Sequence, residues 1–460
     1  MESLRLINSN RLTMKNTVAF LFIFLTITSY AQKKWTLQEC ISYAMKNNLT
    51  IHQGNLNKKI QDYQLVSAKK EKLPGVSASI SNNTNFGQSQ DVFGNSQRND
   101  NFNNSANVGT SILVFNNGRL EKNIRKTEFD VQASQYDVEK TKNDISVQIA
   151  QQYLNILLNR EVEKINRSAY ENAVKVYDRA KITTEVGTTA LTVLAEAEAA
   201  KAREYQNVKS AEVNTKNSLF SLAMLLQLED YRSFDVSDAP DIKEIASSLF
   251  TTDDVLAKAY ESQPQIKAAE SRIRSAETQT DVVKTQYWPS ITASAGIGSY
   301  YYNSLVTNNI GYSGNHIKEK DFFRQYSDNF GQQIGLSASI PIFNKGLTRI
   351  QVEQAKINED IARNSLLLEK QDVLKNVQQA QYSAENYYEV YKAAVEAEKS
   401  SALALDYAEK SYAAGRTTIY DVNTARNNYA SAQGNTAQAK FNYIFQQKLI
   451  EFYAGIPLSL

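Results

Sequence analysis

The chain is poor in the residues from which disulfides, metal sites and catalytic pairs are built. Its 460 residues include one cysteine, Cys40, and two histidines, His52 and His316. One cysteine cannot form a disulfide within the chain, and the histidines lack the Cys or carboxylate spacing of a metal site. No Gly-rich phosphate loop or nucleophile elbow is present. We therefore expect no metal, no cofactor and no enzymatic activity, and we expect Cys40 to pack among apolar neighbours.

Long apolar runs are also scarce. The run Val18–Ile27 follows Lys15 and precedes the small residues Ser29 and Ala31, which is the pattern of a secretory signal peptide, residues 1–31, cleaved after Ala31. Met14 stands where such a signal normally begins. The run is short for a spanning helix, although an uncleaved anchor is the alternative. Because no second long run follows, a polytopic helical membrane protein is excluded, and any membrane part must consist of strands.

The chain also has no large excess of positive or negative charge. The formal net charge is +2, and removal of residues 1–31 brings it close to zero. A balanced chain gives no electrostatic reason to expect nucleic acid as a partner.

Two long stretches contain neither glycine nor proline. They lie between Gly118 and Gly187 and between Gly346 and Gly415, and each pair of glycines is 69 residues apart. The motif Phe-Asn-x-Gly precedes both stretches and Gly-x-Thr follows both, at a common offset of 228 residues. We infer a tandem duplication. The first repeat, 32–250, contains a short helix, two strands, a long helix and a short helix, and the second repeat is 251–460.

Each stretch between these glycines is rich in Ala, Glu, Lys, Gln and Leu, which favour helices. Apolar residues recur at threes and fours, as in Val373, Val377 and Ala380, which indicates an amphipathic helix. Such a helix is roughly 100 Å long, so it must pack lengthwise in a coiled coil. Shorter helices are expected at about 36–72, 188–228, 253–287 and 416–453, stacked end to end in pairs beside the long ones.

Between the first short helix and the long helix of each repeat, the apolar period changes to two. Small polar residues alternate with apolar ones, which fits a transmembrane β-barrel strand and also a half-buried strand of a soluble sheet. Long polar segments at 87–103 and 303–329 favour the barrel, as external loops, and Pro74 and Pro289 mark the change from helix to strand. Tyr300–Tyr302 fit either an interfacial aromatic girdle or strand packing. The apolar positions are Val76, Ala78 and Ile80; Val108, Thr110, Ile112 and Val114; Ile291, Ala293, Ala295 and Ile297; and Ile334, Leu336, Ala338, Ile340 and Ile342.

Four strands leave two open edges, and open edges cannot lie in hydrocarbon. Other copies of the chain must complete the barrel, and strand count alone allows dimers to hexamers. A secreted or periplasmic coiled-coil structural protein is the alternative, which explains the long helices but not four amphipathic strands.

The segment from Tyr412 through Gly415 and Ile419 to Asp421 and Val422, with the repeated Phe-Asn-x-Gly, resembles the TolC-like outer-membrane efflux family, the outer-membrane factors. The resemblance covers Trp35 to the C-terminus. It implies a mixed α and β membrane protein: a homotrimer with a 12-stranded β-barrel, four strands per chain, continued by a long α-helical coiled-coil barrel into the periplasm. Residues 229–252 and both terminal segments are expected to form a collar.

The same resemblance implies a duct through the cell outer membrane and its lipid. Its partners are expected to be a periplasmic adaptor (membrane fusion) protein and an inner-membrane RND or ABC pump of an efflux or type I secretion system. Whether drugs, metal ions or proteins pass through it stays open.

The resemblance also places sites at the helical turns. The family docks its adaptor there, and glycine at a helix C-terminus supplies the left-handed residue needed to reverse direction. A plain hairpin without a partner is the alternative. The expected docking residues are Gly187, Thr188 and Thr189 in the first turn and Gly415, Arg416 and Thr417 in the second.

In the family, acidic residues ring the periplasmic mouth, and a Tyr and an Arg latch it shut. Tyr412 and Asp421 match these positions and Arg416 lies one place before the latch Arg position, but the second acidic position is Thr424 and the first-half aspartate falls on Val193. We therefore expect a looser gate with one ring of three Asp421 carboxylates. Their repulsion should raise at least one pKa and favour cations. Alternatively, Asp421 caps or salt-bridges on a helix surface.

Overall fold

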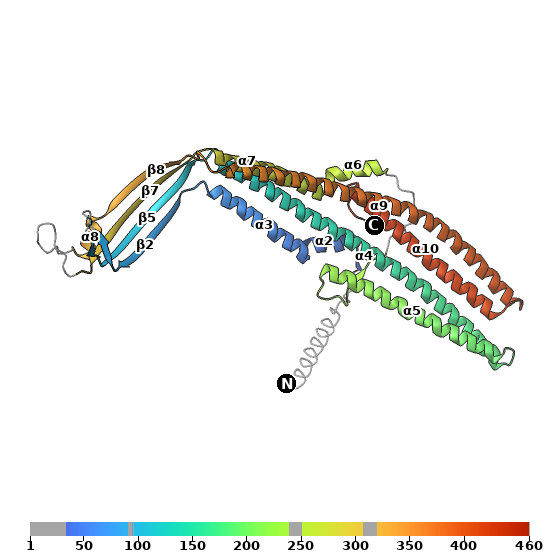
Figure 1. Cartoon of the computed structure of the whole chain (residues 1–460). Coiled ribbons are helices and arrows are strands. Elements are labelled where there is room, and N and C mark those ends of the chain that lie inside the picture. The colour runs from blue at the N-terminus through green and yellow to red at the C-terminus, as the bar shows by residue number, and fades with distance from the viewer. Residues whose placement is uncertain (1–33, 91–93, 95, 239–250, 307–319, 460) are drawn as a thin grey trace, which may run out of the picture. The chain divides into compact units, whose positions relative to one another are not determined.

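The computed structural model describes residues 34–90, 94, 96–238, 251–306 and 320–459, and Figure 1 labels the elements. The expected cleavage site after Ala31, His316 and part of the expected collar lie outside these residues. None of the described helices is long and apolar enough to cross a membrane. The described residues form two compact units: those within 34–52, 141–262 and 373–459 make one, and those within 53–140 and 263–372 make the other. Each unit draws on both expected repeats, and the duplication itself stays a prediction.

Two helices of 67 residues dominate the chain, α4 (Arg119–Glu185) and α9 (Leu347–Ala413). They confirm the prediction made from the stretches without glycine or proline. Each follows a Phe-Asn-x-Gly motif whose last two residues have positive φ, 51° and 73° at Asn117 and Gly118 and 57° and 78° at Lys345 and Gly346. The motif is therefore a tight left-handed turn that leads from a strand into a long helix.

The helices that follow the long ones are α5 (Leu191–Leu226) and α10 (Ile419–Tyr453), as predicted. The single helices expected at 36–72 and 253–287 are wrong, because each is interrupted, at Asn48 and at Gln263. The pieces are α2 (Leu37–Asn47) and α3 (Leu49–Lys70), and α6 (Thr252–Ser262), α7 (Pro264–Lys284) and the 3-10 turn η1 (Thr285–Tyr287).

Both breaks have a local cause. Asn48 is extended, and its side-chain oxygen accepts the N–H groups of Thr50 at 2.9 Å and Ile51 at 3.3 Å, so that it starts a new helix. Gln263 is extended because it precedes Pro264, whose ring disfavours a helical residue before it. The Leu49 N–H also donates to the side chain of Gln227, just beyond α5, so the first residue of α3 contacts the end of α5.

The four longest strands form one antiparallel sheet in the order β2-β5-β7-β8, so that β2 and β8 are its edges. This confirms the four predicted strands and their two open edges. β2 and β7 begin directly after Pro74 and Pro289. The strands are β2 (Gly75–Asn85), β5 (Asn101–Phe115), β7 (Ser290–Ser304) and β8 (Gly331–Ser339).

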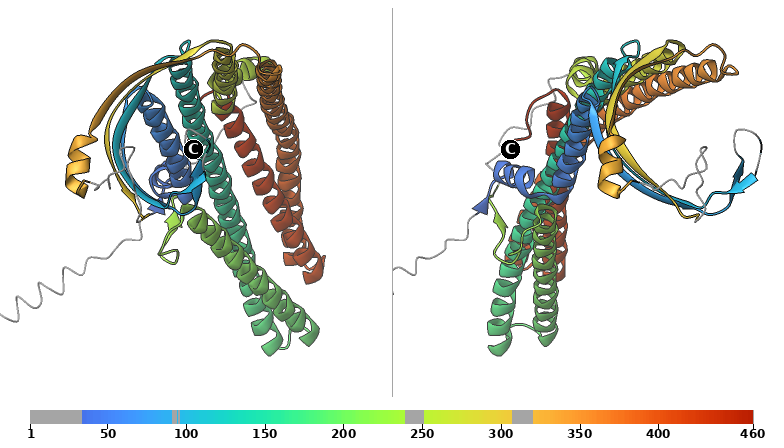
Figure 2. Two further views of the ribbon diagram at one scale, coloured as in Figure 1. Left: turned by 60° about the vertical axis from the view of Figure 1, so that its left-hand side comes forward. Right: turned by 90° about the vertical axis from the view of Figure 1, so that its left-hand side faces the viewer.

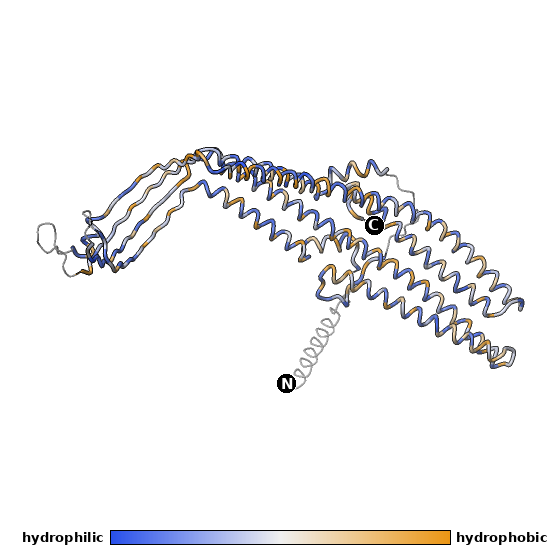
Figure 3. The backbone as a smooth tube through the Cα atoms, viewed as in Figure 1, coloured by the Kyte–Doolittle hydropathy of each residue, from blue (hydrophilic) through white to orange (hydrophobic). Residues whose placement is uncertain are grey.

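The strand register gives the sheet one apolar face. Val108 lies opposite Ile297, and Ala295 opposite Ile334, and residues opposite each other in an antiparallel pair share a face. Aliphatic side chains on this face are open to solvent, with Ile334 92% and Ile80 74% exposed. The other face carries small polar residues, and Figure 3 shows the alternation along the strands. We call these two sides the aliphatic face and the polar face.

Three details of the strand region differ from the sequence expectation. β8 ends at Ser339, so the predicted strand residues Ile340 and Ile342 lie outside it, because Pro341 has no N–H to donate to a ladder. The polar segment 87–103 contains a small pair, β3 (Gln88–Gln90) with β4 (Ser96–Arg98). The segment 303–329 contains the helix α8 (Phe322–Asp328).

Cys40 lies in the core of the first unit with no exposed surface. Burial raises the pKa of its thiol to about 12, so it stays protonated, and the expectation of a packing role is confirmed. In the part of the chain that the structure describes, no three His, Cys, Asp or Glu side chains are grouped as metal ligands would be.

Candidate functional site

The turn from α4 to α5 is closed by two backbone hydrogen bonds. The Gly187 N–H donates to Thr184 O at 3.0 Å, and the Thr188 N–H to Thr183 O at 2.9 Å. Gly187 has φ +81°. This is the Schellman pattern of a helix C-terminus, which needs a left-handed residue. We call residues 187–190 the first tip.

The turn from α9 to α10 repeats this geometry. The Gly415 N–H donates to Tyr412 O at 3.0 Å, and the Arg416 N–H to Ser411 O at 2.9 Å, with Gly415 at φ +68°. We call residues 415–418 the second tip. Both predicted glycines therefore occupy left-handed positions, and Arg416 and Thr188 are exposed beside them.

The second tip carries a polar cap that the first lacks. The Thr418 hydroxyl accepts the Asp421 N–H at 3.3 Å, and Asp421 accepts from the Thr418 N–H at 3.0 Å, which makes a capping box. The Thr417 hydroxyl also donates to this carboxylate, at 2.6 Å. The hydroxyl of Thr417 and then that of Thr418 hold the Asp421 pKa below its ordinary value. Within one chain, Asp421 thus acts as the helix cap that was the alternative to a gate residue.

The equivalent positions of the first tip are Ala190 and Val193. Ala190 is the N-cap of α5 and makes no side-chain hydrogen bond, and Val193 has no polar atom. The two hairpins therefore share a turn but differ in its chemistry.

A groove of about 510 Å³ beside the tips is lined by both hairpins. Thr189 and Val193 of the first hairpin and Tyr412 of the second all contribute to it. The structure thus places the predicted gate residue Tyr412 in the same groove as Val193, the position where the family resemblance puts an aspartate. Because the side chain of Val193 has no polar atom, position 193 offers Tyr412 no carboxylate.

Sequence reasoning missed an ion pair in the same groove. Arg426 of α10 bonds Glu409 of α9 at 2.5 Å, and its side chain is only 13% exposed. Its Nε and Nη1 are buried and have no hydrogen-bond partner within the described part of the chain. The available signal was that two helices expected to pack together carry opposite charges. The sequence does not give the register of the two helices, so the partners could not be matched.

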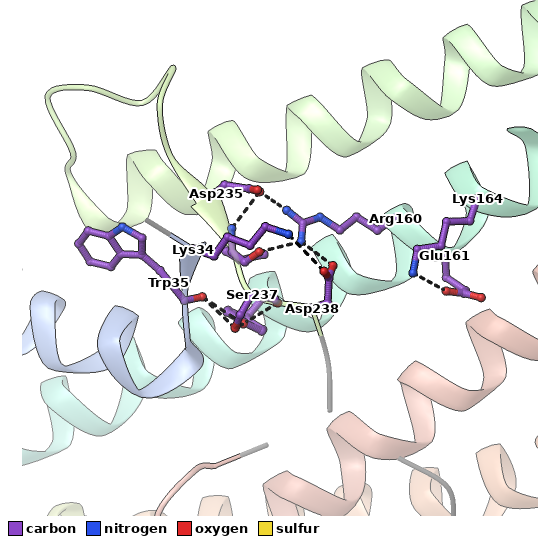
Figure 4. Close-up of polar contacts among 10 residues, drawn as sticks. Lys34, Trp35, Arg160, Glu161, Lys164, Asp235, Ser237 and Asp238 are labelled. Carbon is purple, nitrogen blue, oxygen red and sulfur yellow. Dashed lines mark hydrogen bonds and ion pairs between the residues drawn. The ribbon is translucent and has the colours of Figure 1, made fainter. Parts of the chain in front are cut away.

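Sequence reasoning also missed a cluster of charged residues around Arg160, near the first described residues of the chain (Figure 4). The guanidinium of Arg160 on α4 donates to Val236 O at 2.7 Å and to Asp238 at 3.1 Å, and it also pairs with Asp235. Lys34 bonds the same Asp238 at 3.2 Å. These contacts fix a short parallel pair, β1 (Lys34–Trp35) with β6 (Asp235–Val236), against the long helix.

Curated relatives align with most of the chain at low identity. The outer membrane protein TolC of Escherichia coli K12 is 28% identical over 323 residues, which cover 66% of this chain and 59% of that protein. The outer membrane efflux protein BepC of Brucella suis is 21% identical over 427 residues, covering 91% of this chain and 85% of that protein. The chain thus matches about three fifths of the length of TolC, both in E. coli and in Salmonella enteritidis.

Solved structures share the fold. CusC matches with a TM-score of 0.74 at 16% identity, covering 94% of this chain and 96% of that one. The CmeC outer membrane channel of Campylobacter jejuni matches with a TM-score of 0.73 at 20% identity, covering 92% and 87%. The model of the outer membrane efflux protein family matches residues 40–226 and 255–455. With most of its length matched in this way, the chain belongs to the outer membrane efflux protein family.

Proposed function

We propose that the chain is one protomer of a homotrimeric outer-membrane efflux channel. Three sheets together form a 12-stranded barrel, which the long helices continue as a coiled-coil barrel into the periplasm. The channel receives its substrates from a periplasmic adaptor and an inner-membrane pump and releases them outside the cell. The observation that carries this proposal is the sheet with two unpaired edges and an exposed aliphatic face, in a chain of this family.

The physical argument concerns the environment that such a sheet requires. Aliphatic side chains as exposed as Ile334 and Ile80 are costly in water and suited to lipid, whereas the unpaired backbone of β2 and β8 cannot be exposed to hydrocarbon. Pairing β8 of one copy with β2 of the next meets both requirements. The strands have 9 to 15 residues, enough to cross a bilayer at about 9–11 residues.

The test is the mass and location of the protein. We expect it in the outer-membrane fraction and, after mild detergent extraction, as a particle of three chains. Recovery as a soluble filament would support the coiled-coil structural protein, and a monodisperse detergent-solubilised monomer would refute the barrel.

The two tips are proposed to dock the adaptor. Their support is the exposed turn at the end of each hairpin. We expect Arg416→Glu combined with Thr188→Trp to abolish export while the trimer still assembles, and Arg416→Lys to export normally. Normal export by the double variant would refute the proposal that the adaptor docks at these turns. The residues concerned are Gly187, Thr188, Thr189, Gly415, Arg416 and Thr417.

The gate is proposed to consist of Tyr412, Arg416 and Asp421, with three Asp421 carboxylates at the mouth. The three hydrogen bonds that the Asp421 carboxylate accepts all engage one of its oxygens, so its second oxygen is available to face a pore. Planar-bilayer recordings of Asp421→Asn are the test, with Val193→Asp as the converse change. We expect the first variant to lose cation preference and the second to increase it. Unchanged selectivity in Asp421→Asn would leave this residue as a helix cap alone.

A further inference from the structure

The helix α8 packs on the aliphatic face of the sheet. The rings of Phe322 and Tyr301 are 4.9 Å apart, and the Ser299 hydroxyl donates to Tyr326 O at 2.7 Å. Ser299 and Tyr301 lie two and four residues beyond Ile297 along β7, so alternation puts all three on one face. Figure 2 shows α8 against the outside of the curved sheet.

A series of side-chain hydrogen bonds across the strands holds α8 in place. The Tyr326 hydroxyl donates to the side-chain oxygen of Asn104 on β5, and the Asn104 amide donates to Asn82 on β2 at 2.5 Å. Asn104 shares a face with Val108, four residues away on the same strand. The helix is thus held over two neighbouring strands as well as over β7.

Side-chain amides in and beside α8 also form hydrogen bonds with β7 beyond the point where β8 ends. The pairing of β8 with β7 stops at Gly298 opposite Gly331, although β7 continues to Ser304. Beyond that point, Gln325 accepts the Tyr302 N–H and donates to Tyr302 O, both at 3.0 Å. Asn329 donates to Tyr300 O at 2.8 Å. The helix therefore protects an otherwise open stretch of β7 and has a fixed position on the sheet.

This arrangement bears on Tyr300–Tyr302, which the sequence allowed as an interfacial aromatic girdle or as strand packing. Tyr300 and Tyr302 alternate onto the polar face, and Tyr301 lies against Phe322. The large apolar side chain that points away from the sheet is that of Phe323, which is 79% exposed. Charges around it are balanced, because Lys320 pairs with Asp328 at 2.5 Å and Arg324 and Asp321 offset each other.

We propose that α8 is an interfacial anchor, in which Phe323 inserts among lipid headgroups at the outer rim of the barrel. This inference rests on the proposed function. Lipid is the occupant favoured by the observations, because α8 lies on the same face as the exposed aliphatic side chains and its balanced charges attract no charged partner. Aromatic side chains are stable at the boundary between headgroups and acyl chains.

Spin labels on cysteine variants test the proposal, because buried Cys40 does not compete for the label. Phe323→Cys, Ile334→Cys and Thr188→Cys are labelled separately and reconstituted in phosphatidylethanolamine and phosphatidylglycerol vesicles. Collisions with oxygen, which concentrates in lipid, are compared with collisions with a water-soluble nickel chelate. We expect Ile334 to report hydrocarbon, Thr188 to report water, and Phe323 to report a shallow depth between them.

Each other outcome has a distinct meaning. If the Ile334 label reports lipid but the Phe323 label behaves like that of Thr188, the anchor is refuted and the channel stands. If the Phe323 label is shielded from both reagents, protein covers it and lipid is the wrong occupant. If the Ile334 label also reports water, the proposed barrel itself fails and the anchor fails with it.

Discussion

The first and second tips have the same backbone and different side chains. Each ends a helix of 67 residues with a left-handed glycine and the same pair of hydrogen bonds. Only the second adds a carboxylate, Asp421, held by Thr417 and Thr418, whereas the first has Ala190 and Val193 at the cap positions. The turn therefore depends on glycine, and the carboxylate cap belongs to the second hairpin alone.

The largest effect is expected where the tips are alike. Gly187→Val and Gly415→Val each force a branched side chain into a left-handed conformation, which costs roughly 1–2 kcal/mol. Because a Cβ at either position meets no atom within 4 Å, the cost is conformational only, and Gly→Asn should be tolerated at both tips. Hydrogen exchange of the adjacent helical turns measures the loss. A large effect at one tip and none at the other would contradict the shared turn.

The cap provides the next largest effect, and it should appear at one tip only. Thr418→Ala removes the acceptor for the Asp421 N–H and should destabilise the start of α10 by about 1 kcal/mol. Ala190→Thr introduces a hydroxyl at the N-cap of α5 and should slow exchange in its first turn. If Thr418→Ala leaves exchange at the start of α10 unchanged, the capping box is not stabilising.

Low pH should affect the stability of the two tips differently. The pKa of Asp421 is lowered by the hydroxyls of Thr417 and Thr418, so its stabilising contribution is present above the ordinary aspartate pKa of 3.8 and is lost as pH falls through the lowered value. Spin labels at Tyr420 and at the equivalent Thr192 report mobility from pH 6 to pH 3. We expect only the Tyr420 label to become more mobile below about pH 4. Equal loosening at both positions would exclude the carboxylate as the cause.

The smallest effect is expected from the ion pair in the groove. Glu409 is half exposed, so Glu409→Gln should cost less than about 1 kcal/mol of hairpin stability. The equivalent residue of the first hairpin, Lys181, makes a matched control when changed to Gln. Thermal unfolding of the two variants should differ slightly, with Glu409→Gln the less stable. A loss of several kcal/mol would mean that the buried Arg426 depends on this partner far more than its exposure suggests.

Much of the fold could be predicted because local patterns encode it. The absence of glycine and proline predicted both long helices, and the alternation of apolar and polar residues predicted the four strands. Gly187 and Gly415 predicted the tips. Local patterns failed at Asn48, where a side chain that starts a helix looks like an ordinary helical residue. They also failed at α8, whose seven residues are too few to show a period and whose position depends on β7.

The candidate site was predictable only in part for a similar reason. Tyr412 and Asp421 were placed by motif, but the capping role of Asp421 depends on the hydroxyls of Thr417 and Thr418 in the folded turn. The pair of Arg426 with Glu409 and the contacts of Arg160 join segments 17 to 78 residues apart. Their register follows from packing, which a single sequence does not reveal.

Planar-bilayer recording of the detergent-purified oligomer tests the central claim most directly. If three chains close a barrel, the wild-type protein should insert and give discrete, stable conductance steps. Ile334→Arg places a charge on the aliphatic face, which costs about 2–4 kcal/mol near the middle of a bilayer, and should reduce insertion. Absence of conductance from the wild-type protein, with Ile334→Arg indistinguishable from it, would contradict the proposal that this chain forms an outer-membrane channel.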